Sequence, residues 1–251
     1  MFMSVVTHSP GVPVYAELAG TRVLVTGLSA AHGVDLARAF ADHKCRLVLQ
    51  SAESSPELTA VTAMIAETAS ETKAFTQRLD DSHEAVRFAQ GPAQGLGGLD
   101  TAVNLIAIDP AKLAGLASYE DIEQFVSDAL LPATLMTRVI ANRMRLTMTD
   151  GVVLNVVAMA PPANEAEAML AGIVRSALAA ITRREAEEWA GQGIRINAVG
   201  PRGPFDDVRS GGACLSSGAD IAALALYLAS RKGRQLTGHV FDAEGIATRG
   251  C

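Results

Sequence analysis

The sequence predicts one α/β domain in which a mainly parallel, doubly wound sheet of about seven strands lies between two helical layers. Strand-like and helix-like segments alternate along the chain, which is the order of a parallel sheet with helical crossovers. Hydrophobic residues make up 49% of the 251 residues and aromatic residues only 4%, as expected when aliphatic strands are buried on both faces. This length also suits a single domain.

The expected elements of the first half begin with the β-branched run RVLVT at residues 22–26, a strand that leads into a turn of Gly, Ser and Ala. A helix at residues 34–43 and a second apolar strand at residues 46–50 follow, because short aliphatic runs bounded by polar residues favour strands. The next elements, expected from the same patterns, are a helix at 56–70, a strand at 74–79 and a helix at 82–90.

The second half opens with the apolar run at residues 101–108, which suits a central strand. A long helix is expected at residues 119–144, and Pro132 inside it predicts a kink or a restart near Ala129. The remaining expected elements are strands at 151–158, 194–199 and 239–242 and helices at 165–189 and 220–230.

Charge and composition exclude several classes of partner. The formal net charge of −6 favours neither nucleic acid nor an anionic membrane, and no stretch approaches the roughly 18 apolar residues of a membrane span. Residues 1–20 carry no basic segment followed by an apolar run, so we expect no signal peptide. Cys45, Cys214 and Cys251 lack the spacing of metal ligands, so we expect no metal site, reduced thiols and a cytoplasmic protein.

The turn after the first strand carries the clearest motif. Residues 26–33 read TGLSAAHG, and such a turn before a helix presents backbone N–H groups to a phosphate. The segment resembles the Thr-Gly-x-x-x-Gly-x-Gly motif of the short-chain dehydrogenase/reductase family. Gly27 and Gly33 keep the outer glycines, whereas Ala31 replaces the middle glycine and His32 replaces an aliphatic residue.

Other segments extend this resemblance from about Gly20 to Gly245. They are LDTAVN at 99–104, GIRINAVGP at 193–201, DIA at 220–222, LAS at 228–230 and TGHV at 237–240. The resemblance implies a single Rossmann domain over residues 1–251, with residues 1–19 as an N-terminal extension and residues 202–219 as a shortened lid. It also implies NAD or NADP as the cofactor.

The resemblance implies a set of cofactor-binding positions, several of which carry unsuitable residues. Ser51 stands where NAD-binding members carry an acid for the ribose, Arg202 follows Pro201 where the family has a glycine, and Asp206 replaces a threonine. We therefore expect weak or absent binding of NAD or NADP. The full set is Thr26, Gly27, Ser29, Ala31, His32, Gly33, Ser51, Asp80, Asn104, Arg175, Pro201 and Arg202. Asp80 has the alternative reading of a polar strand end.

The family's catalytic groups are a Tyr acid/base, a Ser that orients the substrate oxygen, a Lys beside the Tyr and a relay Asn. The resemblance of residues 152–158 to the family's Ser-containing strand puts Ala158 at the Ser position. The helix segment RSALAAITR, which begins at Arg175, resembles the family's Lys-containing segment and puts Arg175 at the Lys position and Ala171 at the Tyr position. LMTR at 135–138 puts Ala129 at the Asn position.

Alanine neither donates nor accepts a proton, and loss of a general acid/base typically removes about 10²- to 10⁴-fold in rate. The leading interpretation is therefore a catalytically degenerate family member that binds a ligand or serves as a scaffold subunit. The alternative is an active oxidoreductase or lyase that uses unfamiliar groups, for which the candidates are His32, Arg175, Asp206 and Glu167. Arg175 and Arg202 have two readings: an anion site in the nicotinamide pocket, or structural ion pairs.

The helix at residues 165–189 predicts self-association. Its apolar stripe is wider than one sheet contact requires, and it comprises Met169, Leu170, Ile173, Val174, Ala177, Leu178 and Ile181. In the resembled family this helix also packs on a second copy. We therefore expect a homodimer or homotetramer, or a hetero-oligomer with an active relative.

Overall fold

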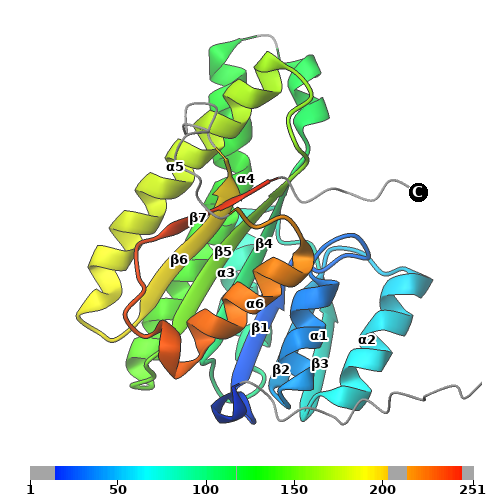
Figure 1. Ribbon diagram of the computed structural model, residues 1–251, viewed down its shortest axis with the longest axis vertical. Coiled ribbons are helices and arrows are strands. Elements are labelled where there is room, and N and C mark those ends of the chain that lie inside the picture. Colours follow the sequence, from blue (N-terminus) through cyan, green and yellow to red (C-terminus); the bar gives the residue numbers. More distant parts are fainter. Residues whose placement is uncertain (1–14, 117, 203–213, 245–251) are drawn as a thin grey trace, which may run out of the picture.

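A computed structural model of the chain describes residues 15–116, 118–202 and 214–244. Within them, seven parallel strands form one sheet in the order β3-β2-β1-β4-β5-β6-β7, flanked by helices on both faces (Figure 1). The strands are β1 (Arg22–Thr26), β2 (Arg46–Ser51), β3 (Glu71–Thr76), β4 (Thr101–Ile108), β5 (Val152–Met159), β6 (Arg195–Pro201) and β7 (Val240–Ala243). The expected three-layer α/β Rossmann fold is confirmed.

Six α-helices connect the strands, and most begin at a side chain that caps free N–H groups. They are α1 (Val34–Asp42), α2 (Pro56–Thr68), α3 (Ser82–Gln90), α4 (Tyr119–Leu146), α5 (Glu165–Ala190) and α6 (Gly218–Ala229). Short 3₁₀ helices lie at Ala16–Leu18, Pro92–Gln94, Pro110–Gly115 and Arg231–Gly233. Ser118 and Asp121 form a reciprocal capping box at the start of α4, whereas α1 follows Gly33 without a side-chain cap.

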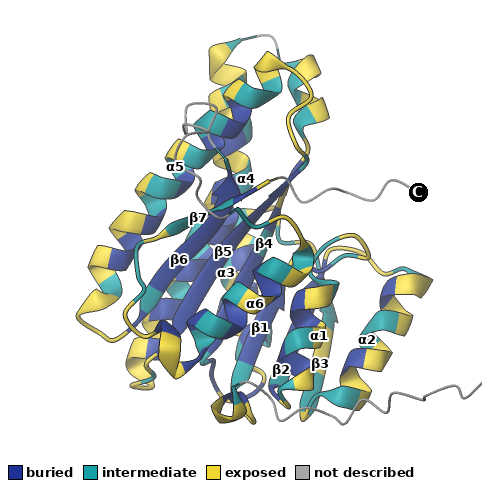
Figure 2. Cartoon of the chain, viewed as in Figure 1, coloured by how far each residue is buried: buried dark blue, intermediate teal, exposed yellow. Residues whose placement is uncertain are grey.

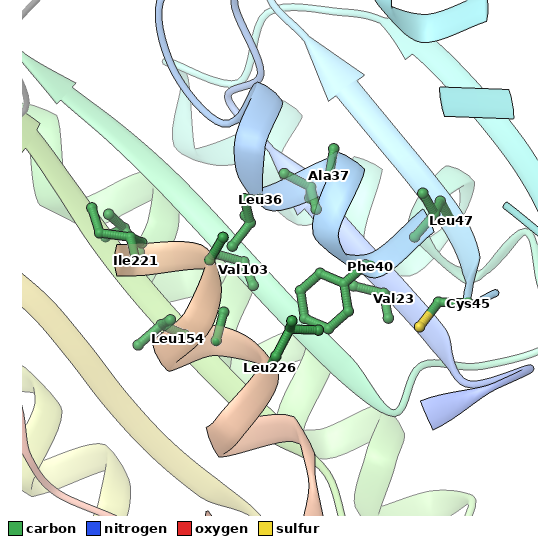
Figure 3. Close-up of a cluster of buried hydrophobic side chains, with 14 of the residues drawn as sticks. Val23, Leu36, Ala37, Phe40, Cys45, Leu47, Val103, Leu154, Ile221 and Leu226 are labelled. Atoms are coloured by element: carbon green, nitrogen blue, oxygen red, sulfur yellow. The ribbon is translucent and has the colours of Figure 1, made fainter. Parts of the chain in front are cut away.

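The sheet is buried from both sides (Figure 2). On one face α1, α2 and α6 pack over β1, β2, β4 and β5, and Phe40 meets Val23 and Leu226 there (Figure 3). On the other face α3, α4 and α5 cover the strands in two further apolar clusters. Because Phe40 is fully buried, its removal would cost about 3–5 kcal/mol.

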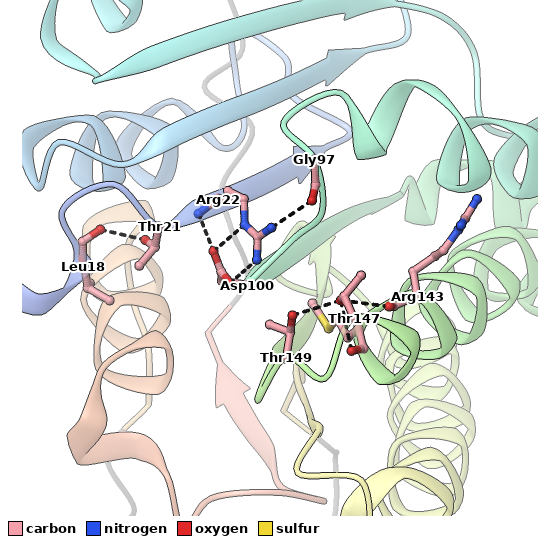
Figure 4. A network of polar contacts seen from close by, with 9 residues as sticks. Leu18, Thr21, Arg22, Gly97, Asp100, Arg143, Thr147 and Thr149 are labelled. Atoms are coloured by element: carbon pink, nitrogen blue, oxygen red, sulfur yellow. Dashed lines mark hydrogen bonds and ion pairs between the residues drawn. The ribbon is translucent and has the colours of Figure 1, made fainter.

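Arg22 and Asp100 tie the start of β1 to the start of β4 (Figure 4). The Arg22 guanidinium donates to both carboxylate oxygens of Asp100, at 2.9 and 2.7 Å, and the Arg22 backbone N–H donates at 2.8 Å. The guanidinium also donates to the Gly97 carbonyl at 3.0 Å. The pair thereby joins two strands that are far apart in sequence.

Two expectations about the elements need correction. The third strand spans Glu71–Thr76 rather than residues 74–79: it pairs with β2 from Arg46↔Glu71 to Ser51↔Thr76, and the Arg46–Glu71 ion pair, 2.6 Å, lies at its start. This edge strand is only partly buried, so its apolar pattern does not mark its limits. Of the kink or restart expected near Ala129, the restart does not occur: α4 continues through Pro132 as one helix.

Parts of two expected segments lie outside the described residues. They are residues 1–14 of the expected extension and residues 203–213 of the expected shortened lid, which include Asp206. Cys251 lies outside them as well. None of the helices in the described ranges combines the length and apolar character that a membrane span requires.

Candidate functional site

A cavity of about 620 Å³ lies at the carboxyl ends of the strands, between the N-termini of α1 and α6. Apolar side chains from four elements line it: Leu36 of α1, Leu105 of β4, Val156 of β5 and Ile221 of α6. Doubly wound sheets bind ligands at this edge, and the volume is that of a small-molecule site. This α1–α6 cavity is the candidate site.

The turn between β1 and α1 forms one wall of the α1–α6 cavity. Gly27 and Gly33 have φ of 72° and 85°, a region that favours glycine. The Gly27 N–H donates to Oε1 of buried Gln50 at 2.7 Å. The N–H of Ser29 donates to the His32 carbonyl, and the His32 N–H donates to Ser29 Oγ, both at 3.0 Å. Three N–H groups of the turn are therefore already satisfied by the protein.

Leu105 fills the concave side of this turn. A methyl group added at Gly33 would lie 2.3 Å from Leu105 Cδ1, and one added at Gly27 would lie 2.2 Å from the Leu105 carbonyl oxygen. A dinucleotide diphosphate needs an open turn with free N–H groups. Leu105 therefore packs closely against both glycines of this turn.

An acidic side chain also faces the cavity. Asp35 lies in the first turn of α1 and lines the cavity, and a methyl group added at Gly218 of α6 would lie 2.7 Å from its Oδ2 atom. Among the described lining residues none is Lys or Arg. Burial lowers the pKa of His32, which lines the cavity too, and thereby favours the neutral ring.

The positions that correspond to the family's catalytic Ser and Tyr are buried. Ala158 is 4% exposed on β5 and Ala171 is 1% exposed on α5, where it packs with Met159 and Leu170 in an apolar cluster. Neither residue lines the α1–α6 cavity. Ala129 of α4 is half-buried beside the same cluster, so these three positions offer no polar group to a substrate.

Arg175 and Arg202 both form ion pairs with the end of the sheet. Arg175 lies 2.5 Å from Asp242 of β7, and its guanidinium also donates to the Val240 carbonyl at 3.4 Å. Arg202 lies 3.9 Å from Glu244, a weaker and more exposed pair. Neither arginine lines the α1–α6 cavity, and the buried Nη1 atom of Arg175 has no hydrogen-bond partner among the described residues.

Thr26 and Asn104 belong to a buried polar network. Thr26 Oγ1 donates to Asn104 Oδ1 at 3.1 Å, and Asn104 Nδ2 donates to Asn155 Oδ1 at 2.8 Å and to Thr137 Oγ1 at 3.2 Å. The network joins β1, β4, β5 and α4. Its amide and hydroxyl groups are used within the core and do not face the cavity.

The remaining candidates lie apart from one another. Ser51 lines a separate cavity of about 150 Å³ between β2 and α2, and Asp80 is an exposed partner of Arg78 at 2.7 Å. Glu167 caps the start of α5 by accepting from the Ala163 N–H at 2.8 Å. Pro201 is buried at the end of β6.

The sequence interpretation missed Asp35, Leu105 and Gln50. The contact of Leu105 with Gly33 depends on the pairing of β1 with β4. An acid two residues after the last glycine of the turn was a readable signal for Asp35. Gln50 carried no signal, because its bond to Gly27 arises only when β2 lies beside β1.

The fold and the glycine-containing turn define a doubly wound α/β protein of the Rossmann type. The family model described as short chain dehydrogenase matches residues 21–206, and the chain belongs to this family. The peroxisomal 2,4-dienoyl-CoA reductase [(3E)-enoyl-CoA-producing] of Pongo abelii is 26% identical over 89% of this chain and 82% of its own length.

Solved structures share the architecture. A putative short-chain alcohol dehydrogenase from Sinorhizobium meliloti 1021 is 25% identical, with a TM-score of 0.72 over 90% of this chain and 96% of its own. The NADH-dependent reductase A1-R′, solved in complex with NAD, is 20% identical, with a TM-score of 0.71 over 92% of this chain and 98% of its own. A short-chain dehydrogenase/reductase from Mycobacterium marinum is 19% identical, with a TM-score of 0.70 over 93% and 97%.

Proposed function

We propose that this chain is a catalytically degenerate member of its oxidoreductase family, which binds a small ligand and performs no hydride transfer through the family's Ser, Tyr and Lys groups. The observation that carries the proposal is Ala171, 1% exposed in an apolar cluster at the acid/base position. Arg175, at the Lys position, is held by Asp242. Neither residue presents a proton donor to the α1–α6 cavity.

The same proposal includes weak or absent binding of NAD and NADP. Family membership and the NAD-complexed neighbour point to a nicotinamide dinucleotide, whereas Leu105 against Gly33 and the satisfied N–H groups of Ser29 and His32 oppose one. The contact of Leu105 with Gly33 and the two engaged N–H groups, those of Ser29 and His32, would each cost about 1 kcal/mol of binding free energy. Together they would weaken binding roughly a hundredfold. Binding of the ADP half alone is compatible with the retained glycines.

Calorimetric titration with NADH and NADPH tests this proposal, together with NAD(P)H oxidation assays on a panel of aldehydes, ketones and enoyl thioesters. We expect dissociation constants no tighter than about 0.1 mM and oxidation at background rates. Low-micromolar binding, or turnover at ordinary enzyme rates of about 1 s⁻¹ or more, would contradict the proposal.

The alternative is an active enzyme with unfamiliar groups, and one observation favours it. His32 lines the cavity, and its Nε2 atom has no hydrogen-bond partner among the described residues. If His32 acts as an acid or base, His32→Ala removes a measurable activity that Arg175→Ala also weakens. Equal background rates for both variants and the parent protein would leave the degenerate member as the better account.

We also propose that the chain self-associates through α4 and α5. A groove of about 390 Å³ between these helices is lined by Ile173, Ala177 and Ile181, with Tyr119 and Leu131 exposed beside it. The α5 stripe thus divides between the sheet, where Leu170, Val174 and Leu178 pack, and this groove. A second copy of the same groove is the proposed occupant. Free thiols at Cys45 and Cys214 support a cytoplasmic location.

A further inference from the structure

We propose that the turn between α4 and β5 docks peripherally on the surface of an anionic lipid bilayer. The docking tip consists of Arg143, Arg145, Leu146 and Met148. It lies at the amino end of the sheet, because it leads into the start of β5, whereas the α1–α6 cavity lies at the carboxyl ends of the strands. The inference is therefore independent of the proposed function.

Two apolar side chains of the docking tip are exposed to water. Met148 is 92% exposed, the highest value among the large hydrophobic residues of the described chain, and Leu146 is 59% exposed. Neither belongs to one of the three apolar clusters of the core. Neighbouring apolar side chains that pack on nothing in their own chain are typical of a surface that binds a protein or a membrane.

The backbone at Met148 is a second, independent observation. The Met148 N–H donates to the Arg145 carbonyl at 3.1 Å, and the Thr149 N–H donates to the Met144 carbonyl at 2.9 Å. These two bonds form a Schellman motif, in which glycine usually fills the left-handed position. Met148 fills it here, with φ of 50°. A methionine at this position lowers stability, and its exposed side chain gains almost no packing in return, which favours a role in binding.

Hydrogen bonds fix the shape of the turn (Figure 4). Thr147 Oγ1 lies 3.0 Å from the Arg143 carbonyl oxygen and 3.0 Å from Thr149 Oγ1. It also lies 3.1 Å from the Met144 carbonyl oxygen. The apolar side chains therefore project from an ordered backbone, and docking orders little additional chain.

The two arginines of the docking tip have no acidic partner. Arg143 donates to the Gln90 carbonyl at 3.4 Å. Arg145 donates to Asn142 Oδ1 at 3.2 and 2.9 Å. Neither arginine forms an ion pair with an acid of the described chain. Cations beside exposed apolar groups are complementary to anionic headgroups above a hydrocarbon layer.

The shape of the docking tip favours a bilayer over a folded protein. Its apolar side chains project outward, and none of the three cavities described above is lined by residues 140–150. A folded partner would need a matching pocket for each side chain, whereas lipid chains rearrange around both of them. Arginine side chains extend along apolar surface to reach polar headgroups.

The net charge of the chain is −6, which opposes attraction to an anionic surface at long range. Charges more than about 10 Å apart are largely screened at about 0.1 M salt, so the charges at the point of contact decide the interaction. Asp150, the acid that follows the turn, lies against Gly193 in the next loop. The contact surface therefore keeps its positive charge.

Co-sedimentation of the full chain with lipid vesicles tests the inference. Vesicles with about 30% phosphatidylglycerol in phosphatidylcholine should bind the chain at least about tenfold more tightly than pure phosphatidylcholine vesicles, because two arginines contact the anionic headgroups. An increase in salt from about 0.1 M to about 1 M should remove most of this preference.

Met148→Gly separates docking from folding. Loss of the side chain should weaken binding to the anionic vesicles at least about fivefold. Glycine suits the left-handed backbone, so urea titration should show a folding equilibrium constant about threefold or more above that of the parent. Met64→Ala is the matched control at another exposed methionine, on α2, and should leave vesicle binding unchanged.

Arg145→Gln tests the contribution of charge. It should weaken binding to the anionic vesicles about fivefold and leave binding to the neutral vesicles unchanged. Arg38→Gln, at an exposed arginine of α1, removes the same charge away from the docking tip and should have little effect on either.

Two outcomes would overturn the inference. The first is a parent chain that binds no vesicles at about 5 mM lipid, which would leave a folded protein as the partner of the docking tip. The second is a loss of binding in Met64→Ala or Arg38→Gln equal to that in Met148→Gly or Arg145→Gln, which would place the contact elsewhere on the chain.

Discussion

Individual side chains carry the proposed loss of the family's activity at this site. The hydroxyl, phenol and amide that the family places at its reaction centre correspond here to Ala158, Ala171 and Ala129, and all three positions are buried or half-buried. Leu105 adds a second change, because its side chain packs against the turn that would hold a phosphate. The proposed loss of catalysis and the proposed loss of cofactor affinity therefore rest on different residues.

Ala171→Tyr tests whether the residue at the acid/base position is packed as part of the hydrophobic core. Inserting a phenol ring beside Met159 and Leu170 should destabilise the protein by about 1–3 kcal/mol through overpacking, measured by urea unfolding followed by circular dichroism. Ala180→Tyr, at an exposed position on the same helix, is the matched control and should change stability little. Unchanged stability of Ala171→Tyr together with NADH oxidation would show that the position still opens onto a reaction centre.

Cys45 should be unreactive in the folded protein. Its side chain is fully buried, and burial raises the pKa of the Cys45 thiol to about 11, so almost no thiolate is present at pH 8. A thiol-specific disulfide reagent should label Cys45 only at the rate of unfolding, and addition of urea should release it. Rapid labelling of Cys45 in native buffer would contradict the placement of this thiol beneath Leu18 and Thr21.

At the level of elements, the strongest polar connection is the one between the starts of β1 and β4. Burial alone would raise the pKa of Asp100, but hydrogen bonds from the Arg22 side chain and backbone outweigh it and leave that pKa lowered. A carboxylate with a lowered pKa in the folded state stabilises the protein above the pKa of the unfolded chain. This stabilisation is lost as the pH falls through the folded-state value.

Asp100→Asn should therefore lower stability by about 1–3 kcal/mol at pH 7, and the difference from the parent protein should shrink below about pH 4. Urea titrations at pH 7 and pH 3 measure both effects. Asp80→Asn breaks an ion pair of the same 2.7 Å length that is more than 60% exposed on each side, and it should change stability little. Equal losses of stability for Asp100→Asn and Asp80→Asn would show that burial does not set the strength of these ion pairs.

The strands also show which elements can be predicted from sequence patterns and which cannot. Runs such as RVLVT at β1 and the apolar residues of β4 and β5 identify central strands, because both faces are buried and the pattern is continuous. β3 was misplaced because this edge strand is only partly buried, so its apolar residues do not mark where it begins and ends. Gln50 and Leu105 could not be interpreted from spacing, because their partners are brought near only by the sheet.

At the level of the whole molecule, the α4–α5 groove leads to a prediction about self-association. The α4–α5 groove holds apolar side chains at the surface, including Leu131, which is 44% exposed. Leu131→Glu should convert a dimer into a monomer in light-scattering measurements coupled to gel filtration, because a charge in an apolar interface loses its hydration. Met64→Glu, at an exposed residue of α2 outside the groove, should leave the mass unchanged. A parent protein that is already monomeric would contradict self-association.

The strand order has a consequence for synthesis on the ribosome. β1 lies between β2 and β4, and Thr26 at its end bonds to Asn104, which is 78 residues later in the chain. Translation at about 5–20 residues per second means that β1 emerges about 4–15 s before β4. During that interval the hydrogen-bonding edge of β1, fully covered in the finished sheet, is open to any other nascent strand. The first half of this protein is therefore the part that a chaperone would have to shield.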